Sequence, residues 1–369
     1  MLDASPLTID HFPAFLARIP AHIDLAALAR ETKAFRRPRG VRSATDLLRL
    51  ALAWGPGGHS MQRVAAWAGA YGIASLTEDA LHQRLHATAP FLEALTQALL
   101  AVIGPVPCWH GQAVRISDGS GLRGLASRGV EWRVHGVYDL GLGRFTHLEV
   151  TDNHGGEALD RGAPVAGEIR IADRGFANAH AWRRFLDAAD APAHFIVRMR
   201  WNGIKLTDPA GGRFEVADWL AGLQASEEEI HETTVLAHAG AREPPIRIRL
   251  IARRKPQPAI DAELERLRKR SVRRQRPIDP RSRLAAMYVV LATSLGATDF
   301  PAAEVLAVYR LRWQIELAFK RLKSLLHIDR LRTRTAAGTR CWLYAHLIVA
   351  LLSDDLGQDF LESFPSGAV

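Results

Sequence analysis

The pattern of apolar and polar positions divides the chain into stretches with different periods. In residues 1–105, Leu and Ala recur at intervals of three and four, which predicts helices. In residues 106–200, apolar positions alternate with polar ones, which predicts strands. Residues 302–327 return to the helical period without Gly or Pro, so we expect one long helix there. The other helices expected from this period are Asp46–Trp54, Met61–Ala68, Phe91–Val102 and the closing Trp342–Leu352.

The alternating stretch predicts strands that lead into acidic side chains. Val114 and Ile116 lead to Asp118 and then Gly119, so we expect a buried strand that ends in a tight turn. Glu168–Ile171 forms a second apolar strand that leads directly to Asp173. The other elements expected here are a hairpin of Val130–Leu140 and Phe145–Val150, a helix over Ala177–Ala191 and a strand over His194–Arg200.

The long helix expected over 302–327 has one polar and one apolar face. One narrow face carries Tyr309, Arg312, Glu316 and Lys323. The opposite face carries Val308, Leu311, Ile315, Ala318, Leu322, Leu325 and Leu326. The apolar face should be buried against a core, so the polar face looks into a cleft or into solvent. A solvated face with local ion pairs is the simplest alternative to a functional site.

Two helices in the N-terminal stretch have the spacing of a helix-turn-helix. Ser60–Trp67 predicts the first helix, and Ser75 with Glu78 matches a capping box that opens a second helix through His86. The second helix would expose His82, Gln83 and Arg84 to a DNA groove. An ordinary helical hairpin explains the same pattern equally well.

Two segments are strongly basic. The first, Arg36–Gly40, is too rich in Pro and Gly for a helix, and it leads into a helix that Ser43 is expected to cap. The second runs from Arg266 to Arg283, where nine Lys or Arg accompany one acid. On a basic protein, such runs favour contact with phosphates over a merely solvated surface.

The regular pattern is interrupted between residues 201 and 284. Ile230–Leu236 and Pro245–Ile251 alternate as strands do, so we expect a β-rich insertion followed by the basic helix. Met287–Leu295 then returns to the core as a strand that Tyr288 opens.

The composition predicts a negatively charged partner and the compartment in which the protein works. The 369 residues contain 48 Lys and Arg against 39 Asp and Glu, a net charge of +9 with a pI near 10.0, which points to nucleic acid. The 48% hydrophobic content supports a substantial folded core. Cys108 and Cys341 are too few for a disulfide framework or a cysteine zinc site, so we expect reduced cytosolic thiols. We expect neither export nor membrane insertion, because the start lacks a signal pattern and Cys341–Leu352 is shorter than the ~20 residues of a span.

Several motifs together resemble one family. The four polar residues of the long helix read Y-(2)-R-(3)-E-(6)-K. Asp118-Gly119-Ser120, Asp173-Arg174-Gly175-Phe176, and Thr151-Asp152 followed by Gly155-Gly156-Glu157 accompany them. With these motifs the chain resembles, over nearly its whole length, the bacterial insertion-sequence transposases of the DDE class, in the cut-and-paste family named for that tetrad. A joint match of this kind is far rarer than any single motif.

The resemblance implies an α/β fold, with an RNase H-like catalytic core, a β-rich insertion that interrupts it, and an all-helical N-terminal DNA-binding domain. The corresponding boundaries are 1–105 for the helical domain, 106–200 and 286–355 for the two parts of the core, 201–285 for the insertion and 356–369 for a tail.

The resemblance also implies the chemistry. Asp118, Asp173 and Glu316 would be the catalytic carboxylates and would hold two Mg²⁺ or Mn²⁺ ions per active site, the ions that hard oxygen ligands select. The activity implied is cleavage at the ends of the element, a hairpin intermediate and strand transfer to target DNA. The residues expected to contact DNA are Tyr309, Arg312, Lys323, Tyr288, Arg36, Arg37, Arg39, Arg84, Arg273 and Arg274, with Tyr288 as a candidate for stacking on a flipped base.

The partners implied are double-stranded DNA and a second copy of the chain. The DNA would comprise the terminal inverted repeats of the element and the target, and the chain would act on them as a homodimer. The location implied is the bacterial cytoplasm, at the nucleoid.

Other interpretations of the same residues remain open. An Asp before Gly commonly caps a turn, and Asp139 and Asp152 are rivals for the second carboxylate, although neither follows an isolated apolar strand as Asp173 does. Tyr288 fits plain strand packing at least as well as base stacking. A repressor that binds terminal repeats, or a domesticated remnant, would keep the basic segments without needing three carboxylates. A nuclease on the same fold would need the carboxylates but not the two cations of the tetrad.

Overall fold

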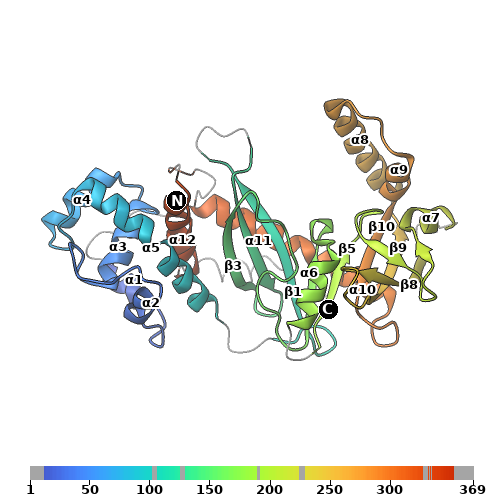
Figure 1. Cartoon of the computed structure of the whole chain (residues 1–369), viewed down its shortest axis with the longest axis horizontal. Helices are drawn as coiled ribbons and strands as arrows, with labels where there is room; N and C mark the ends of the chain where they lie inside the picture. The colour runs from blue at the N-terminus through green and yellow to red at the C-terminus, as the bar shows by residue number, and fades with distance from the viewer. Residues whose placement is uncertain are drawn as a thin grey trace.

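The computed structural model describes residues 12–101, 106–124, 129–188, 192–223, 229–326, 331, 333 and 335–352. In this part of the chain, a helical N-terminal region is followed by a large mixed sheet with helices packed on it (Figure 1). Two helices, α8 (Gln257–Arg274) and α9 (Pro280–Ala286), extend beyond the sheet at the side opposite the N-terminal helices (Figure 1). The tail expected over 356–369 lies outside the described residues.

Within the described residues, the N-terminal region is helical, as its period of three and four predicts. Ser43 caps the third helix as expected, because its hydroxyl accepts a hydrogen bond from the Asp46 amide at 3.0 Å. The buried Leu and Ala residues of the third helix pack against the helices around it. The helices are α1 (Phe12–Leu16), α2 (Leu25–Glu31), α3 (Ala44–Trp54), α4 (Met61–Ala70) and α5 (Glu78–Leu100).

Helix α5 differs from its prediction at its start and in its length. Thr77, and not Ser75, is the N-cap, because its hydroxyl accepts a hydrogen bond from the Ala80 amide at 3.3 Å. The helix then continues through Pro90 and includes the helix expected to begin at Phe91. A proline inside a helix costs about 3 kcal/mol. One buried stripe continues on both sides of Pro90 and offsets that cost; it comprises Leu81, Leu85, Leu92 and Leu95.

The described strands form one ten-stranded sheet in the order β3-β2-β1-β4-β5-β10-β9-β8-β6-β7. Strand β2 is antiparallel to both β1 and β3, whereas β4 and β5 run parallel to β1. The mixed sheet confirms the α/β class that we expected, with three antiparallel strands followed by two parallel ones. The strands are β1 (Ala113–Leu122), β2 (Trp132–Asp139), β3 (Arg144–Asp152), β4 (Glu168–Ala172), β5 (His194–Arg198), β6 (Lys205–Thr207), β7 (Arg213–Phe214), β8 (Ile230–His238), β9 (Ile246–Arg254) and β10 (Tyr288–Thr293).

The segment expected as an insertion is β-rich, and its strands extend the central sheet. Strand β10 returns to the core and pairs antiparallel with β5 on one side and with β9 on the other. The inward residues of β9 alternate as predicted, with Ile246, Ile248 and Leu250 buried in one apolar cluster. Within that segment, α7 (Val216–Ala221) packs against α9.

The long helix expected over 302–327 is divided by a tighter turn. It consists of α10 (Ala302–Tyr309), a 3₁₀ turn η2 (Arg310–Arg312) and α11 (Trp313–Leu326). Ile315, Ala318 and Leu322 are buried as predicted, but Leu311 is 40% exposed. A 3₁₀ turn uses three residues per turn where an α-helix uses 3.6, so it rotates Leu311 off the apolar stripe. Residue 327 lies outside the described part of the chain.

The last described helix, α12 (Ala336–Leu352), joins the helical region to the sheet. It packs against α5 and α3 and reaches β3. The Tyr344 hydroxyl donates to Glu93 of α5 at 2.7 Å and accepts from the Val150 amide of β3 at 3.2 Å. In the chain as described, no helix combines the length and apolar character that crossing a membrane requires.

Candidate active site

The two predicted aspartates occupy neighbouring positions on parallel strands. The pairing of β1 with β4 aligns Ser117 with Ala172, and the next residues along are Asp118 and Asp173. Asp173 leaves the sheet and precedes the turn η1 (Arg174–Phe176). Asp118 does not end its strand, because β1 stays paired with β2 as far as Leu122. The expected turn after Asp118 is therefore wrong, since continued cross-strand pairing overrides the turn preference of Asp-Gly.

Arg312 connects the aspartates to the third carboxylate. Its Nη1 lies 3.8 Å from Oδ2 of Asp118, and its Nη2 donates to Oε1 of Glu316 at 2.5 Å. Burial acts to lower the pKa of Arg312, but the bond to Glu316 and the charge of Asp173, among others, raise it above its usual value. One guanidinium thus interacts with all three predicted carboxylates.

Asp118 lies in a largely buried position. Burial raises the pKa of Asp118 to about 6, and the nearby charges of Glu157 and Glu316 add to this shift. The Gly119 amide, which donates to Oδ1 at 2.8 Å, and Arg312 act in the opposite direction. Burial and the two neighbouring carboxylates together outweigh the Gly119 amide and Arg312. An added cation would therefore stabilise the ionised form of Asp118.

The remaining residues of the tetrad lie at the two ends of the site. Burial, followed by the charge of Asp173, raises the pKa of Tyr309 to about 12, so its phenol stays a neutral donor. Lys323 donates to the Gly121 carbonyl at 2.9 Å, near the end of β1. Asp118, Glu316 and Lys323 line one open cavity of about 340 Å³.

The three carboxylates suit a divalent ion by their chemistry. They supply the hard oxygen atoms that Mg²⁺ and Mn²⁺ prefer, and Oδ1 of Asp173 is buried without a hydrogen-bond partner. Among the described residues, no three His, Cys, Asp or Glu side chains lie close enough to hold an ion as they stand. Glu316 is paired with Arg312 and would have to exchange that partner for the ion.

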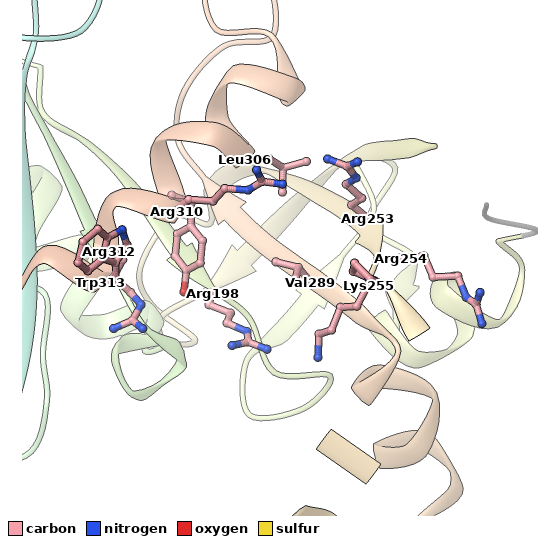
Figure 2. Close-up of a pocket in the computed structure, with 11 residues that line it drawn as sticks. Arg198, Arg253, Arg254, Lys255, Val289, Leu306, Arg310, Arg312 and Trp313 are labelled. Carbon is pink, nitrogen blue, oxygen red and sulfur yellow. The ribbon is translucent and has the colours of Figure 1, made fainter. Parts of the chain in front are cut away.

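A cationic pocket adjoins the end of the site that holds Tyr309 and Arg312. It has a volume of about 450 Å³, and its described lining contains six cations and no acid: Arg198, Arg253, Arg254, Lys255, Arg310 and Arg312. Figure 2 shows Arg198, Lys255 and Arg312 directed to the same side of this pocket. Burial, with a smaller effect of Arg198, lowers the pKa of Lys255 to about 8. The pocket is therefore suited to a polyanion.

A second cavity, of about 560 Å³, extends from this pocket to α8. It shares Arg198 and Lys255 and also includes Tyr288, Arg273 and Arg274. Tyr288 is only 6% exposed and packs in an apolar cluster, which favours the packing alternative for its ring. The two arginines end α8 and bring the second basic segment to the same cavity.

The other predicted DNA contacts lie in the N-terminal region, apart from the carboxylates (Figure 1). Arg36, Arg37 and Arg39 are exposed on an irregular segment. Arg84 of α5 is partly buried and donates to the Arg39 carbonyl at 3.0 Å. This hydrogen bond joins the basic segment Arg36–Gly40 to α5. His82 and Gln83 are exposed on α5 as expected.

The rival carboxylates have other roles. Asp139 is fully buried, and it accepts a hydrogen bond from Arg115 at 2.9 Å. Asp152 is exposed and accepts from the His154 amide at 2.9 Å in a turn after β3. The acidic residues that interact with Arg312 are Asp118, Glu316 and Asp173, so Asp173 remains the second carboxylate of the candidate site.

Sequence reasoning assigned no role to several residues near the site. Arg198 is the last residue of β5 and Arg254 is the last residue of β9. Their sequence signal was a basic residue at the end of an apolar strand. Glu157 lies beside both aspartate segments, and its one sequence signal was its place in the Gly-Gly-Glu motif.

Sequence comparisons with known proteins point to one family. Residues 110–352 match the transposase DDE domain family. The chain is 40% identical over 366 residues to the InsL protein of the insertion sequence element IS186A from Escherichia coli (strain K12), which covers 97% of each chain. It is also 40% identical over 367 residues to the transposase for insertion sequence element IS421 from Escherichia coli, again with 97% of each chain covered.

A solved structure shows a weaker likeness. It is a cryo-EM structure of a piggyBac transposase synaptic complex with hairpin DNA, with a TM-score of 0.42 and 8% sequence identity over 96% of this chain and 82% of that one. A likeness at this level carries no argument about the present chain. The family match and the near full-length relatives, in contrast, show the family. This chain belongs to the DDE transposases of insertion sequences.

Proposed function

We propose that this transposase moves its element by cut-and-paste transposition. It would cleave a strand at each end of the element, form a hairpin there and join the freed ends to target DNA. The observation that carries the proposal is the meeting of Asp118 and Glu316 at Arg312, within electrostatic reach of Asp173. A protein that only binds DNA has no use for three carboxylates around one cation.

The carboxylates would hold the divalent ions. Asp118, Asp173 and Glu316 fit Mg²⁺ or Mn²⁺, two per site, which when bound would neutralise charge on the reacting phosphate and activate the attacking oxygen. The rest of the site would bind and orient DNA. Arg312 would grip a phosphate oxygen, and the neutral Tyr309 phenol would donate to another.

The cationic pocket supports a distorted DNA strand as the ligand. A hairpin brings phosphates close together, and a pocket whose described lining contains six cations and no acid is suited to that charge density. Lys323, which lines the cavity that contains Asp118, would hold the strand on the other side of the scissile phosphate. We infer an RNase H-like core from the strand order, and DNA binding by the helical region from its exposed arginines.

The direct test uses the purified chain, duplexes carrying the two element ends, and Mg²⁺. Nicked ends, hairpins and joined products on a denaturing gel are the expected outcome, and a homodimer should hold two ends together. Asp118→Asn, Asp173→Asn and Glu316→Gln should each abolish cleavage and leave end binding nearly unchanged.

Other products would favour the other candidate functions. Cleavage without hairpins or joined products would favour a nuclease on the same fold. Binding of the ends without any cleavage would favour a repressor or a remnant. Cleavage that survives one of the three substitutions would remove that residue from the site.

A further inference from the structure

The connection between β3 and β4 covers the face of the sheet opposite α11. Side chains alternate along β1, and the Asp118 face is the α11 face, because a Cβ on its cross-strand partner Gly136 would lie 2.8 Å from the Phe319 ring of α11. Gly119 and Gly121 therefore face the other way. The connection is anchored there, since Arg161 donates to the Glu149 carboxylate at 2.7 Å.

Glu157 projects from this connection to the backbone beside both aspartates. A Cβ on Gly175, two residues after Asp173, would lie 1.8 Å from Oε2 of Glu157. A Cβ on Gly119, directly after Asp118, would lie 3.2 Å from Oε1. The carboxylate thus occupies the space that side chains would take at both positions.

The carboxylate of Glu157 also pairs with the side chain of Arg133. Oε1 of Glu157 accepts a hydrogen bond from Nη1 of Arg133 at 3.2 Å, and both side chains are 26% exposed. Arg133 of β2 is the cross-strand partner of Gly121 of β1, and its Cδ lies 3.2 Å from the position of a Cβ on Gly119. Arg133 and Glu157 therefore approach Asp118 from one face, while Arg312 and Glu316 approach it from the other.

We propose that Glu157 is a positioning residue of the catalytic centre, which fixes the backbone after Asp118 and Asp173 and directs Arg133 to a phosphate of the bound strand. The inference rests on the proposed function, because it concerns the same site. Glu157 acts through its neighbours and is not itself a ligand of the divalent ions. Its loss disturbs the placement of the aspartates, and a small misplacement of reacting groups costs a large part of the rate.

The first test measures nicking of element-end DNA by the full chain in a single turnover at saturating DNA. Glu157→Gln should lower the rate about 10- to 100-fold, with the dissociation constant for the ends changed by no more than about twofold. Arg133→Gln should also lower the rate, and the double variant should be no slower than the slower single variant, because both remove one unit. If the rate losses of the two single variants multiplied in the double variant, Glu157 and Arg133 would act independently and the proposed coupling would be wrong. An unchanged rate in Glu157→Gln would overturn the proposal.

The second test uses the space at Gly175. Gly175→Ala should slow nicking as Glu157→Gln does, because the new methyl group displaces the carboxylate. In a Glu157→Ala background the same methyl group meets no carboxylate, so it should cause no further loss. A further loss in that background would mean that Gly175 is needed for another reason, and it would overturn the steric part of the proposal.

The third test separates a positioning residue from a ligand. Mn²⁺ bound to the chain without DNA is counted by electron paramagnetic resonance; Glu157→Gln should keep the wild-type number, and Asp118→Asn should lose at least one ion. A lower number in Glu157→Gln would overturn the proposal. Glu215→Gln is the control, since it breaks an exposed Glu–Arg pair, with Arg213, outside the connection and the site, and it should keep the wild-type rate. A wild-type chain that does not nick ends would contradict the proposed function itself, whereas a nicking wild type with an equally active Glu157→Gln would contradict this inference alone.

Discussion

Arg312 and Glu316 form an ion pair across one helical turn, with Nη2 of the arginine 2.5 Å from Oε1 of the glutamate. The same guanidinium lies 3.8 Å from Asp118, so Arg312 stands between two predicted metal ligands. This placement couples the position of Arg312 to that of the carboxylates. It also suggests that the two residues have separable roles along one helix.

The first prediction concerns this division of roles. Arg312→Ala should accumulate nicked ends with at least about tenfold fewer hairpins, because Arg312 contacts DNA where it is most distorted. Glu316→Gln should give neither product, since the carboxylate is needed at every chemical step. Denaturing gels of end-labelled DNA measure both products, with the exposed Glu304→Gln of α10 as the control. If Arg312→Ala blocked nicking as completely as Glu316→Gln, Arg312 would belong to the support of the metal site.

The second prediction concerns pH and stability. The pKa of Asp118 is raised, mainly by burial, from 3.8 to about 6. The folded state therefore binds more protons than the unfolded state between these values, and stability falls as pH rises through them. Asp118→Asn should remove this loss and stabilise the metal-free chain by up to about 3 kcal/mol at pH 7.5, with almost no gain near pH 3.5.

Thermal unfolding in EDTA at the two pH values measures this effect. Asp152→Asn is the control, because Asp152 is exposed and an amide oxygen can still cap its turn. An equal gain for Asp118→Asn at both pH values would mean that charge burial is not its cause.

The third prediction concerns salt. If Arg36, Arg37 and Arg39 contact phosphates, replacing all three with Gln should make the dependence of log affinity on log salt shallower by up to about 3. Replacing Arg273 and Arg274 should lower the slope by up to about 2. Fluorescence anisotropy with element-end DNA at several salt concentrations gives the slopes. An unchanged slope would mean that these segments are solvated surface that does not contact phosphates.

The fourth prediction concerns the cationic pocket. Arg198→Gln and Arg254→Gln should each weaken binding of hairpin-ended DNA by about tenfold, since a hydrogen bond to a charged phosphate is lost. Arg247→Gln is a matched control, because Arg247 is exposed on the same strand as Arg254 but does not line the pocket. Equal affinities of all three variants for the hairpin would exclude the pocket as its binding site.

Local signals in the sequence predicted many of the elements. Ser43 caps its helix, the hairpin of β2 and β3 forms as its alternation indicates, and β4 is buried at every position. These predictions depend on residues that are close in the chain. The predictions for Ser75, Leu311 and the turn after Asp118 were wrong, because a nearby threonine, a 3₁₀ turn and a long cross-strand pairing each outweighed the local preference.

By itself, the sequence determined the set of acidic and basic groups and their spacing along strands and one helix, because side-chain direction follows the period of the backbone. The tertiary structure alone decided which groups meet. Arg312 bridges Asp118 and Glu316, and Glu157 reaches both aspartate segments, because strand register and helix packing set distances between residues that are far apart in the chain. The cationic pocket has the same origin, since β10 lies between β5 and β9 and brings the basic ends of those two strands to one place.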